Sequence, residues 1–153
     1  MSETFNKKLL IAVDDSPNAR RAVTYVAEMF GGGLGFNVLL LHVIPEPEED
    51  FFPDDMERVR WLEARQHKME EVLAKLRGIL LQAGFQPGNA TVKCVLRRTD
   101  SLAKAIMDER DQMEASTVVV GRQGISASEE FLFGSVSNRL MHVAKRCAVW
   151  IIN

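Results

Sequence analysis

Cysteine, long apolar runs and an excess of either charge are all scarce in this chain of 153 residues. Its two cysteines, Cys94 and Cys147, form no C-x-x-C motif and leave no second pair for a zinc site. We therefore expect both to be buried as small apolar side chains. The longest apolar runs, such as Leu9–Val13 and Val38–Leu41, are far shorter than the roughly 20 residues that span a bilayer. No membrane-spanning helix is expected.

The charges nearly balance, because 19 Lys and Arg face 21 Asp and Glu and leave a net charge of −2. No overall positive field exists to attract nucleic acid or anionic lipid, and we predict neither partner. Residues 1–13 lack the long apolar core of a secretory signal, so we expect a cytoplasmic protein. With 46% hydrophobic residues, the chain can bury the core of one domain over residues 1–153.

Short β-branched or leucine-rich runs alternate with longer segments of helical period. This alternation predicts a single three-layer α/β domain, in which helices cover both faces of a mostly parallel sheet. Strands are expected at residues 8–13, 36–44, 90–96, 117–120 and 148–152. Helices are expected after Ser16-Pro17, from Asp55 to Ala83, after a cap at Thr99 or Asp100, and after Gly134-Ser135.

The long helix from Asp55 to Ala83 has apolar residues at helical spacing along its whole length. We expect one face of it to pack and the other to carry charge. The apolar positions are Val59, Leu62, Met69, Val72, Leu73, Leu76, Ile79, Leu80 and Ala83. The preceding connector, residues 46–57, holds seven acids and no base. We interpret it as a solvated loop that leads into a helix N-terminus, where negative charge is favoured.

Two predicted strands end in residues that suit ligand binding. In open α/β sheets, ligands bind beyond the carboxyl ends of the strands. The first strand ends near Asp14, and the fourth leads into Gly121-x2-Gly124-x9-Gly134-Ser135. Gly121 would permit a sharp exit from the strand, Gly124 a close backbone approach, and Gly134 would open a helix whose N–H groups attract an anion. The spacing predicts a phosphate cradle; glycines that only shape a strand–loop–helix joint are the alternative.

The chain resembles the universal stress protein family over nearly its whole length. The segments that carry the resemblance are KKLLIAVDDSPNARRAVTYVAE, LLLHVIPEP and VVVGRQGISASEEFLFGSVSNRLMHVAKRCAVWII. The third contains the family's ATP-binding signature, Gly-x2-Gly-x9-Gly-Ser/Thr, in full. The resemblance implies an adenine-nucleotide α-hydrolase-like fold with a five-stranded parallel sheet in the order 3-2-1-4-5. It also implies ATP, or AMP or ADP, in the crevice between strands one and four.

The family's nucleotide contacts, transferred by position, fall on four parts of the chain. Ala12, Val13 and Asp14 would border the adenine, Val43 would hold its edge, Gly121, Arg122 and Gly124 would line the ribose and phosphates, and Gly134, Ser135, Val136 and Ser137 would bind the phosphate tail. The positions that depart from the family pattern are Asp15, Arg97, Arg98, Ser116 and Ala148. None touches the phosphate signature, but Asp15 adds a negative charge beside the adenine.

Two glutamates, Glu129 and Glu130, lie in the loop that would cover the triphosphate, where only Arg122 is basic. Either they point to solvent, or a divalent cation bridges them to the phosphates; we expect Mg-ATP as the bound species. No catalytic residue is predicted. The three histidines, His42, His67 and His142, lack ligand spacing, so we expect them to be packed or surface residues.

Fast phosphoryl transfer lacks its usual parts here, namely a phosphate-binding lysine, a positioned base or an arginine pair. We expect a nucleotide-dependent regulator or sensor of the stress response, which acts on an unknown protein partner and hydrolyses ATP slowly at most. A genuine ATPase or adenylate-using enzyme on this fold, and a nucleotide-free interaction module, are the alternatives. The apolar strand 148–152 would lie at a sheet edge, and we expect a homodimer to form through it.

Overall fold

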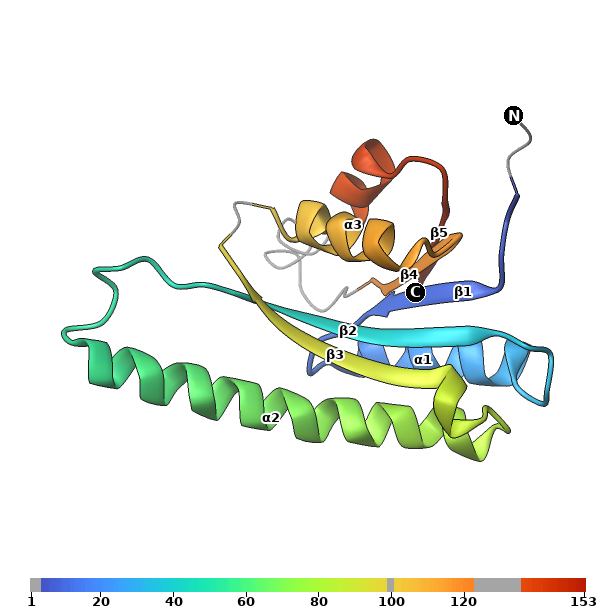
Figure 1. Cartoon of the computed structure of the whole chain (residues 1–153), viewed down its shortest axis with the longest axis horizontal. Coiled ribbons are helices and arrows are strands. Elements are labelled where there is room, and N and C mark those ends of the chain that lie inside the picture. The colour runs from blue at the N-terminus through green and yellow to red at the C-terminus, as the bar shows by residue number, and fades with distance from the viewer. Residues whose placement is uncertain (1–3, 99–100, 123–135) are drawn as a thin grey trace.

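Five parallel strands form one sheet in the order β3-β2-β1-β4-β5 (Figure 1). The computed structural model describes residues 4–98, 101–122 and 136–153. The strands are β1 (Lys8–Ala12), β2 (Asn37–Pro45), β3 (Ala90–Arg97), β4 (Thr117–Gly121) and β5 (Ala148–Ile152). The fold class and the strand order that the resemblance implied are confirmed.

Helices cover both faces of this sheet. They are α1 (Pro17–Phe30), α2 (Asp55–Gln82), the short 3₁₀ helix η1 (Pro87–Asn89), α3 (Leu102–Met113) and a last helical stretch at 136–143. Leu9 and Ile11 of β1 pack with α1 and α2, whereas Leu10 packs with α3 and the last helix. Because successive side chains of a strand point to opposite faces, a strand covered on both faces is apolar throughout.

The helix ends follow their capping residues. Ser16 caps α1 by accepting a hydrogen bond from the Ala19 N–H at 3.2 Å, and Pro17 takes the first helical position. The helix ends before Gly31, whose N–H donates to the Ala27 carbonyl. The cap predicted for α3 was wrong: Ser101, not Thr99 or Asp100, accepts the Lys104 N–H, because the helix begins only at Leu102.

Helix α2 does not pack along its whole length, contrary to the expectation from its periodicity. Its buried residues are Met69, Leu73, Leu76 and Leu80, all in its second half. Val59, in the first half, is exposed. The first half extends beyond the end of the sheet, so no strand lies against it (Figure 1). The same spacing of apolar residues therefore buries one half of the helix and leaves the other open.

Both cysteines are free thiols and only half-buried, whereas full burial was expected. Cys94 lies on the edge strand β3, and Cys147 directly precedes the opposite edge strand β5. An edge position leaves a side chain less covered than a central one does. Burial nevertheless raises the pKa of each thiol, which keeps the nucleophilic thiolate scarce. Among the helices of the described ranges, none is long and apolar enough to cross a lipid bilayer.

Candidate functional site

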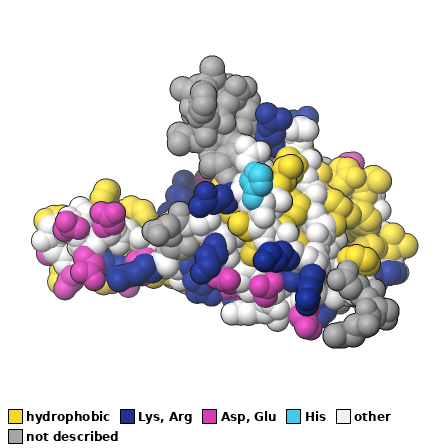
Figure 2. Space-filling view, turned by 90° about the horizontal axis from the view of Figure 1, so that it is seen from above, with side chains coloured by type: hydrophobic (Ala, Val, Ile, Leu, Met, Phe, Trp, Pro, Cys, Tyr) yellow, Lys and Arg dark blue, Asp and Glu magenta, His cyan; other side chains and the backbone are white. Residues whose placement is uncertain are grey.

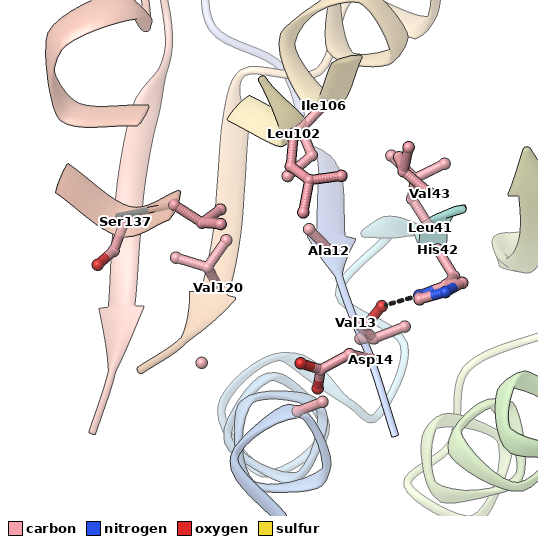
Figure 3. A pocket seen from close by; sticks show the side chains of 13 residues that line it. Ala12, Val13, Asp14, Leu41, His42, Val43, Leu102, Ile106, Val120 and Ser137 are labelled. Carbon is pink, nitrogen blue, oxygen red and sulfur yellow. Dashed lines mark hydrogen bonds between the residues drawn. The ribbon is translucent and has the colours of Figure 1, made fainter. Parts of the chain in front are cut away.

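A cavity of about 260 Å³ lies at the carboxyl ends of β1, β2 and β4 (Figure 3). The connection after β1 leads to α1 on one face of the sheet, and the chain after β4 returns as the helical stretch 136–143 on the other face. This divergence creates the crevice in which open α/β sheets bind ligands. The start of α3 closes the cavity from above β1 with Leu102 and Ile106.

Seven of the eleven residues that sequence reasoning assigned to the site line this cavity. They are Ala12, Val13, Asp14, Val43, Gly121, Val136 and Ser137. Gly124, Gly134 and Ser135 lie outside the described residues, as do Glu129 and Glu130. The structure does not bring Arg122 to the cavity wall: this residue is exposed, and its backbone N–H donates to the Ile152 carbonyl at 2.7 Å.

Gly121 is required by packing rather than by a sharp exit from the strand. It is the last residue of β4, and a Cβ at this position would overlap the backbone carbonyl of Asn18 in the first turn of α1. The strand end and the helix start therefore touch through the missing side chain. A larger residue here would displace α1 as well as narrow the cavity.

The two acidic residues after β1, Asp14 and Asp15, have different surroundings. Asp14 lines the cavity and accepts a hydrogen bond from the hydroxyl of Ser16, the residue that caps α1. Asp15 is not part of the cavity wall, and its carboxylate forms an exposed ion pair with Lys68 of α2 at 3.2 Å. The negative charge that seemed to disfavour a nucleotide is therefore turned away from the cavity.

His42 is a cavity residue that sequence reasoning treated only as a packed or surface side chain. It is 6% exposed, and its Nδ1 donates to the Val13 carbonyl at 2.7 Å, as the dashed line in Figure 3 shows. The carbonyl can only accept, so the proton sits on Nδ1. Burial lowers the pKa of the imidazole and favours its neutral form. Among the described residues, Nε2 finds no hydrogen-bond partner.

The strand register indicates where the backbone groups of Val43 point. The Val13 N–H donates to the Leu41 carbonyl at 2.8 Å, which is the last such contact between the ends of β1 and β2. In a parallel ladder, alternate residues turn their N–H and C=O groups to the same neighbour. Val43 is thus the next residue of β2 to face the β1 side, after β1 has ended. One donor and one acceptor point past the strand end.

A comparison with protein-family models identifies the family of this chain. The model of the universal stress protein family matches residues 6–153. The chain belongs to this family. A search of curated proteins gives no match.

Solved structures of other universal stress proteins share this architecture. The UspA protein from Lactobacillus plantarum is 18% identical, with a TM-score of 0.73 over 98% of this chain and 99% of that one. A universal stress protein in complex with cAMP is 19% identical, with a TM-score of 0.70 over 96% and 97%. The protein from Archaeoglobus fulgidus in complex with dAMP is 22% identical, with a TM-score of 0.61 over 98% and 100%. These similarities establish the fold.

The cavity of this universal stress protein has largely apolar walls. Apart from His42, the wall residues that sequence reasoning did not assign to the site are Ala19, Leu41, Leu102, Ile106 and Val120. Their apolar spacing is that of ordinary core positions, so no local signal separated them from the core. Together with Asp14 and the backbone of Val43, they form an apolar slot with polar groups at its rim, which suits a flat ring bearing hydrogen-bonding edges.

Proposed function

We propose that this cavity binds an adenine nucleotide, with the base between the apolar walls and its edge against Val43. The observation that carries the proposal is the bond from the Val13 N–H to the Leu41 carbonyl at the end of β1. By alternation it places the backbone N–H and C=O of Val43, a cavity residue, on the same side past the strand end. Adenine presents an amino donor beside a ring-nitrogen acceptor, which complements a backbone C=O and N–H. The cAMP and dAMP complexes of two structural neighbours support the same ligand class.

The phosphates would lie toward the helical stretch 136–143. Val136 and Ser137 in its first turn line the cavity, and N–H groups in a first helical turn attract anions. The signature residues Gly124, Gly134 and Ser135 would complete the proposed phosphate site. We propose ATP as the ligand, with AMP and ADP as alternatives. Mg²⁺ would bridge the phosphates to Glu129 and Glu130.

The bound nucleotide would act as a regulatory signal rather than as the substrate of a fast enzyme. Among the described residues that line the cavity there is no lysine or arginine, and the histidine Nδ1 is occupied by the Val13 carbonyl. Fast phosphoryl transfer depends on lysine or arginine side chains positioned against the phosphates. We therefore propose a cytoplasmic, nucleotide-dependent regulator of the stress response with slow ATP hydrolysis at most.

Calorimetric titration with ATP, ADP and AMP tests the proposal, in Mg²⁺ and again in EDTA. Ala12→Leu adds methyl groups inside the cavity and should weaken binding at least tenfold. Ala64→Leu makes the same change on the exposed surface of α2 and should bind as the wild type does. EDTA should weaken ATP binding and leave AMP binding nearly unchanged.

Three outcomes would contradict parts of this proposal. Equal affinities for Ala12→Leu and the wild type would move the site away from the cavity. No binding by the wild type would favour a nucleotide-free interaction module. Turnover of labelled ATP above about 1 s⁻¹, in the ordinary range of enzymes, would instead indicate a genuine ATPase.

A further inference from the structure

The first half of α2 and the loop before it form a projection beyond the end of the sheet. We call residues 46–63 the arm. Residues 55–68 precede the first buried residue of α2, Met69, and span about 21 Å at 1.5 Å per residue. Figure 1 shows the arm extending past the end of the sheet, and Figure 2 shows its hydrophobic and acidic side chains next to one another on the left.

Aromatic side chains cluster on the arm. Phe51 and Phe52 meet edge to face with ring centroids 4.9 Å apart, and Phe52 contacts Trp61 of α2 at 5.7 Å. Phe51 is 71% exposed and Trp61 39%. Monomeric proteins seldom leave several large apolar side chains together in water, and such patches commonly mark interaction sites. The cluster comprises Phe51, Phe52 and Trp61.

The charge around the cluster has one dominant sign. The arm contains eight acids against two arginines. The acids are Glu46, Glu48, Glu49, Asp50, Asp54, Asp55, Glu57 and Glu63. Arg58 is engaged by Glu46, and Arg98 of the neighbouring segment lies 3.5 Å from the carboxylates of Glu46 and Glu49. Most of the remaining carboxylates have no cation of the arm to balance them.

The structure holds the arm in place at its base. The Glu46 N–H donates to the Arg97 carbonyl of β3 at 2.9 Å, and the Glu46 carboxylate binds Arg58 of α2. The Asp54 side chain caps α2 by accepting the Glu57 N–H at 2.8 Å. A surface ordered before binding loses less conformational entropy when a partner arrives. The arm is therefore presented as a formed surface.

We propose that the arm docks a cationic amphipathic segment of a partner protein. Aliphatic side chains of that segment would cover Phe51, Phe52 and Trp61, and its lysines and arginines would face the surrounding carboxylates. Helical segments dock through an apolar face, and complementary charge selects among them. Nucleic acid and anionic lipid are repelled by the same carboxylates. This surface lies beyond the proposed nucleotide site and needs no bound nucleotide.

Trp61 can report the docking directly. The chain has two tryptophans, so in a Trp150→Phe background all tryptophan emission comes from Trp61. The probe is a synthetic 18-residue peptide of leucine and lysine at helical spacing. Its addition should shift the Trp61 emission to shorter wavelength and saturate, and raising the salt from 50 to 300 mM should weaken binding severalfold. A peptide with glutamate in place of lysine should not bind.

Matched variants separate the cluster from the charge alone. In the same background, Phe51→Ala should weaken binding at least tenfold. Phe5→Ala removes an equally exposed ring, 68% exposed, at the far end of the molecule and should change nothing. The proposal is overturned if the lysine peptide causes no saturable shift, or if both variants bind as the background does. It is also overturned if sedimentation shows that Phe51→Ala converts an oligomer into monomers. The arm would then bind a second copy of this chain.

Discussion

His42 shapes the cavity by securing the junction of two strands. Its Nδ1 holds the Val13 carbonyl at the point where β1 ends, and the next residue of its own strand, Val43, faces the cavity. The contact joins residues 29 positions apart in the chain. Spacing between histidines, which guided the sequence interpretation, carries no information about a bond from a ring to a distant backbone oxygen.

Burial of His42 should make the stability of the protein depend on pH. Desolvation lowers the pKa of the imidazole; Arg65 also lowers it, whereas the bond to Val13 and the charge of Asp14 raise it. Below the ordinary value of 6.5, the unfolded chain takes up a proton that the folded chain resists. The contribution of His42 to stability is therefore complete above pH 6.5 and is lost as the pH falls.

Urea unfolding between pH 5 and 7.5 measures this effect. His42→Asn keeps a side-chain N–H for the Val13 carbonyl but cannot titrate. The unfolding free energy of the wild type should fall faster with decreasing pH than that of the variant, by at most about 1.4 kcal/mol per pH unit for one proton. Parallel curves would show that the buried ring does not couple folding to pH.

The elements themselves were predictable from local pattern, but their packing was only partly so. All five strands begin and end within one residue of the predicted positions, and α1 begins at Pro17 as its cap required. Apolar runs and capping residues act locally, which explains this agreement. The exposure of Val59 was not predictable, because burial of a helix face depends on how far the sheet extends beneath it.

A buried carboxylate fixes α3 against β3. Glu109 of α3 is 2% exposed, and its carboxylate binds Lys93 at 2.6 Å and Arg97, both on β3. Glu109→Gln should lower the unfolding free energy by roughly 1–3 kcal/mol, since it removes the partner of two cations; both cations are partly exposed and recover some hydration. Urea denaturation measures the loss.

The matched control for this prediction is Asp111→Asn on the same helix. Asp111 pairs with Arg110 at 2.8 Å, but its side chain is largely exposed, and Arg110 keeps bonds to the Ala115 and Arg146 carbonyls. Exposed pairs contribute little, so the control should change stability by less than about 0.5 kcal/mol. If both variants lost the same unfolding free energy, the burial of Glu109 would not make its ion pairs more stabilising than an exposed pair.

The charge of the whole molecule is unevenly divided. The net charge is only −2, yet the arm carries eight acids against two arginines, so the rest of the chain is net positive. The proposed nucleotide site belongs to the positive body and the proposed docking surface to the negative arm. Composition alone suggested a near-neutral molecule and could not show this division. The acidic run at 46–57 is visible in the sequence. The apolar walls of the cavity were not, since folding brings them together from α1, α3, the last helical stretch and three strands.

Strand β5 is an outer strand of the sheet that the described residues form, and we propose that a homodimer pairs through it. The Ala148 N–H donates to the Ser116 carbonyl and the Ile152 carbonyl accepts from Arg122, so residues 148, 150 and 152 turn their backbone groups to the β4 side. By alternation, Val149 and Ile151 present theirs to the open edge. Trp150 is already stacked on Phe30 with centroids 5.2 Å apart, which steadies this strand. An apolar edge of this kind favours pairing with a second copy.

Val149→Pro tests the dimer because it removes one edge N–H and leaves the contacts with β4 intact. Sedimentation equilibrium at micromolar concentration should show a dimer for the wild type and a monomer for the variant. Circular dichroism should show the same secondary structure for both, which separates lost pairing from lost folding. Phe51→Ala, which alters only the arm, should remain dimeric. A monomeric wild type, or a variant that stays folded and dimeric, would show that β5 does not form the interface.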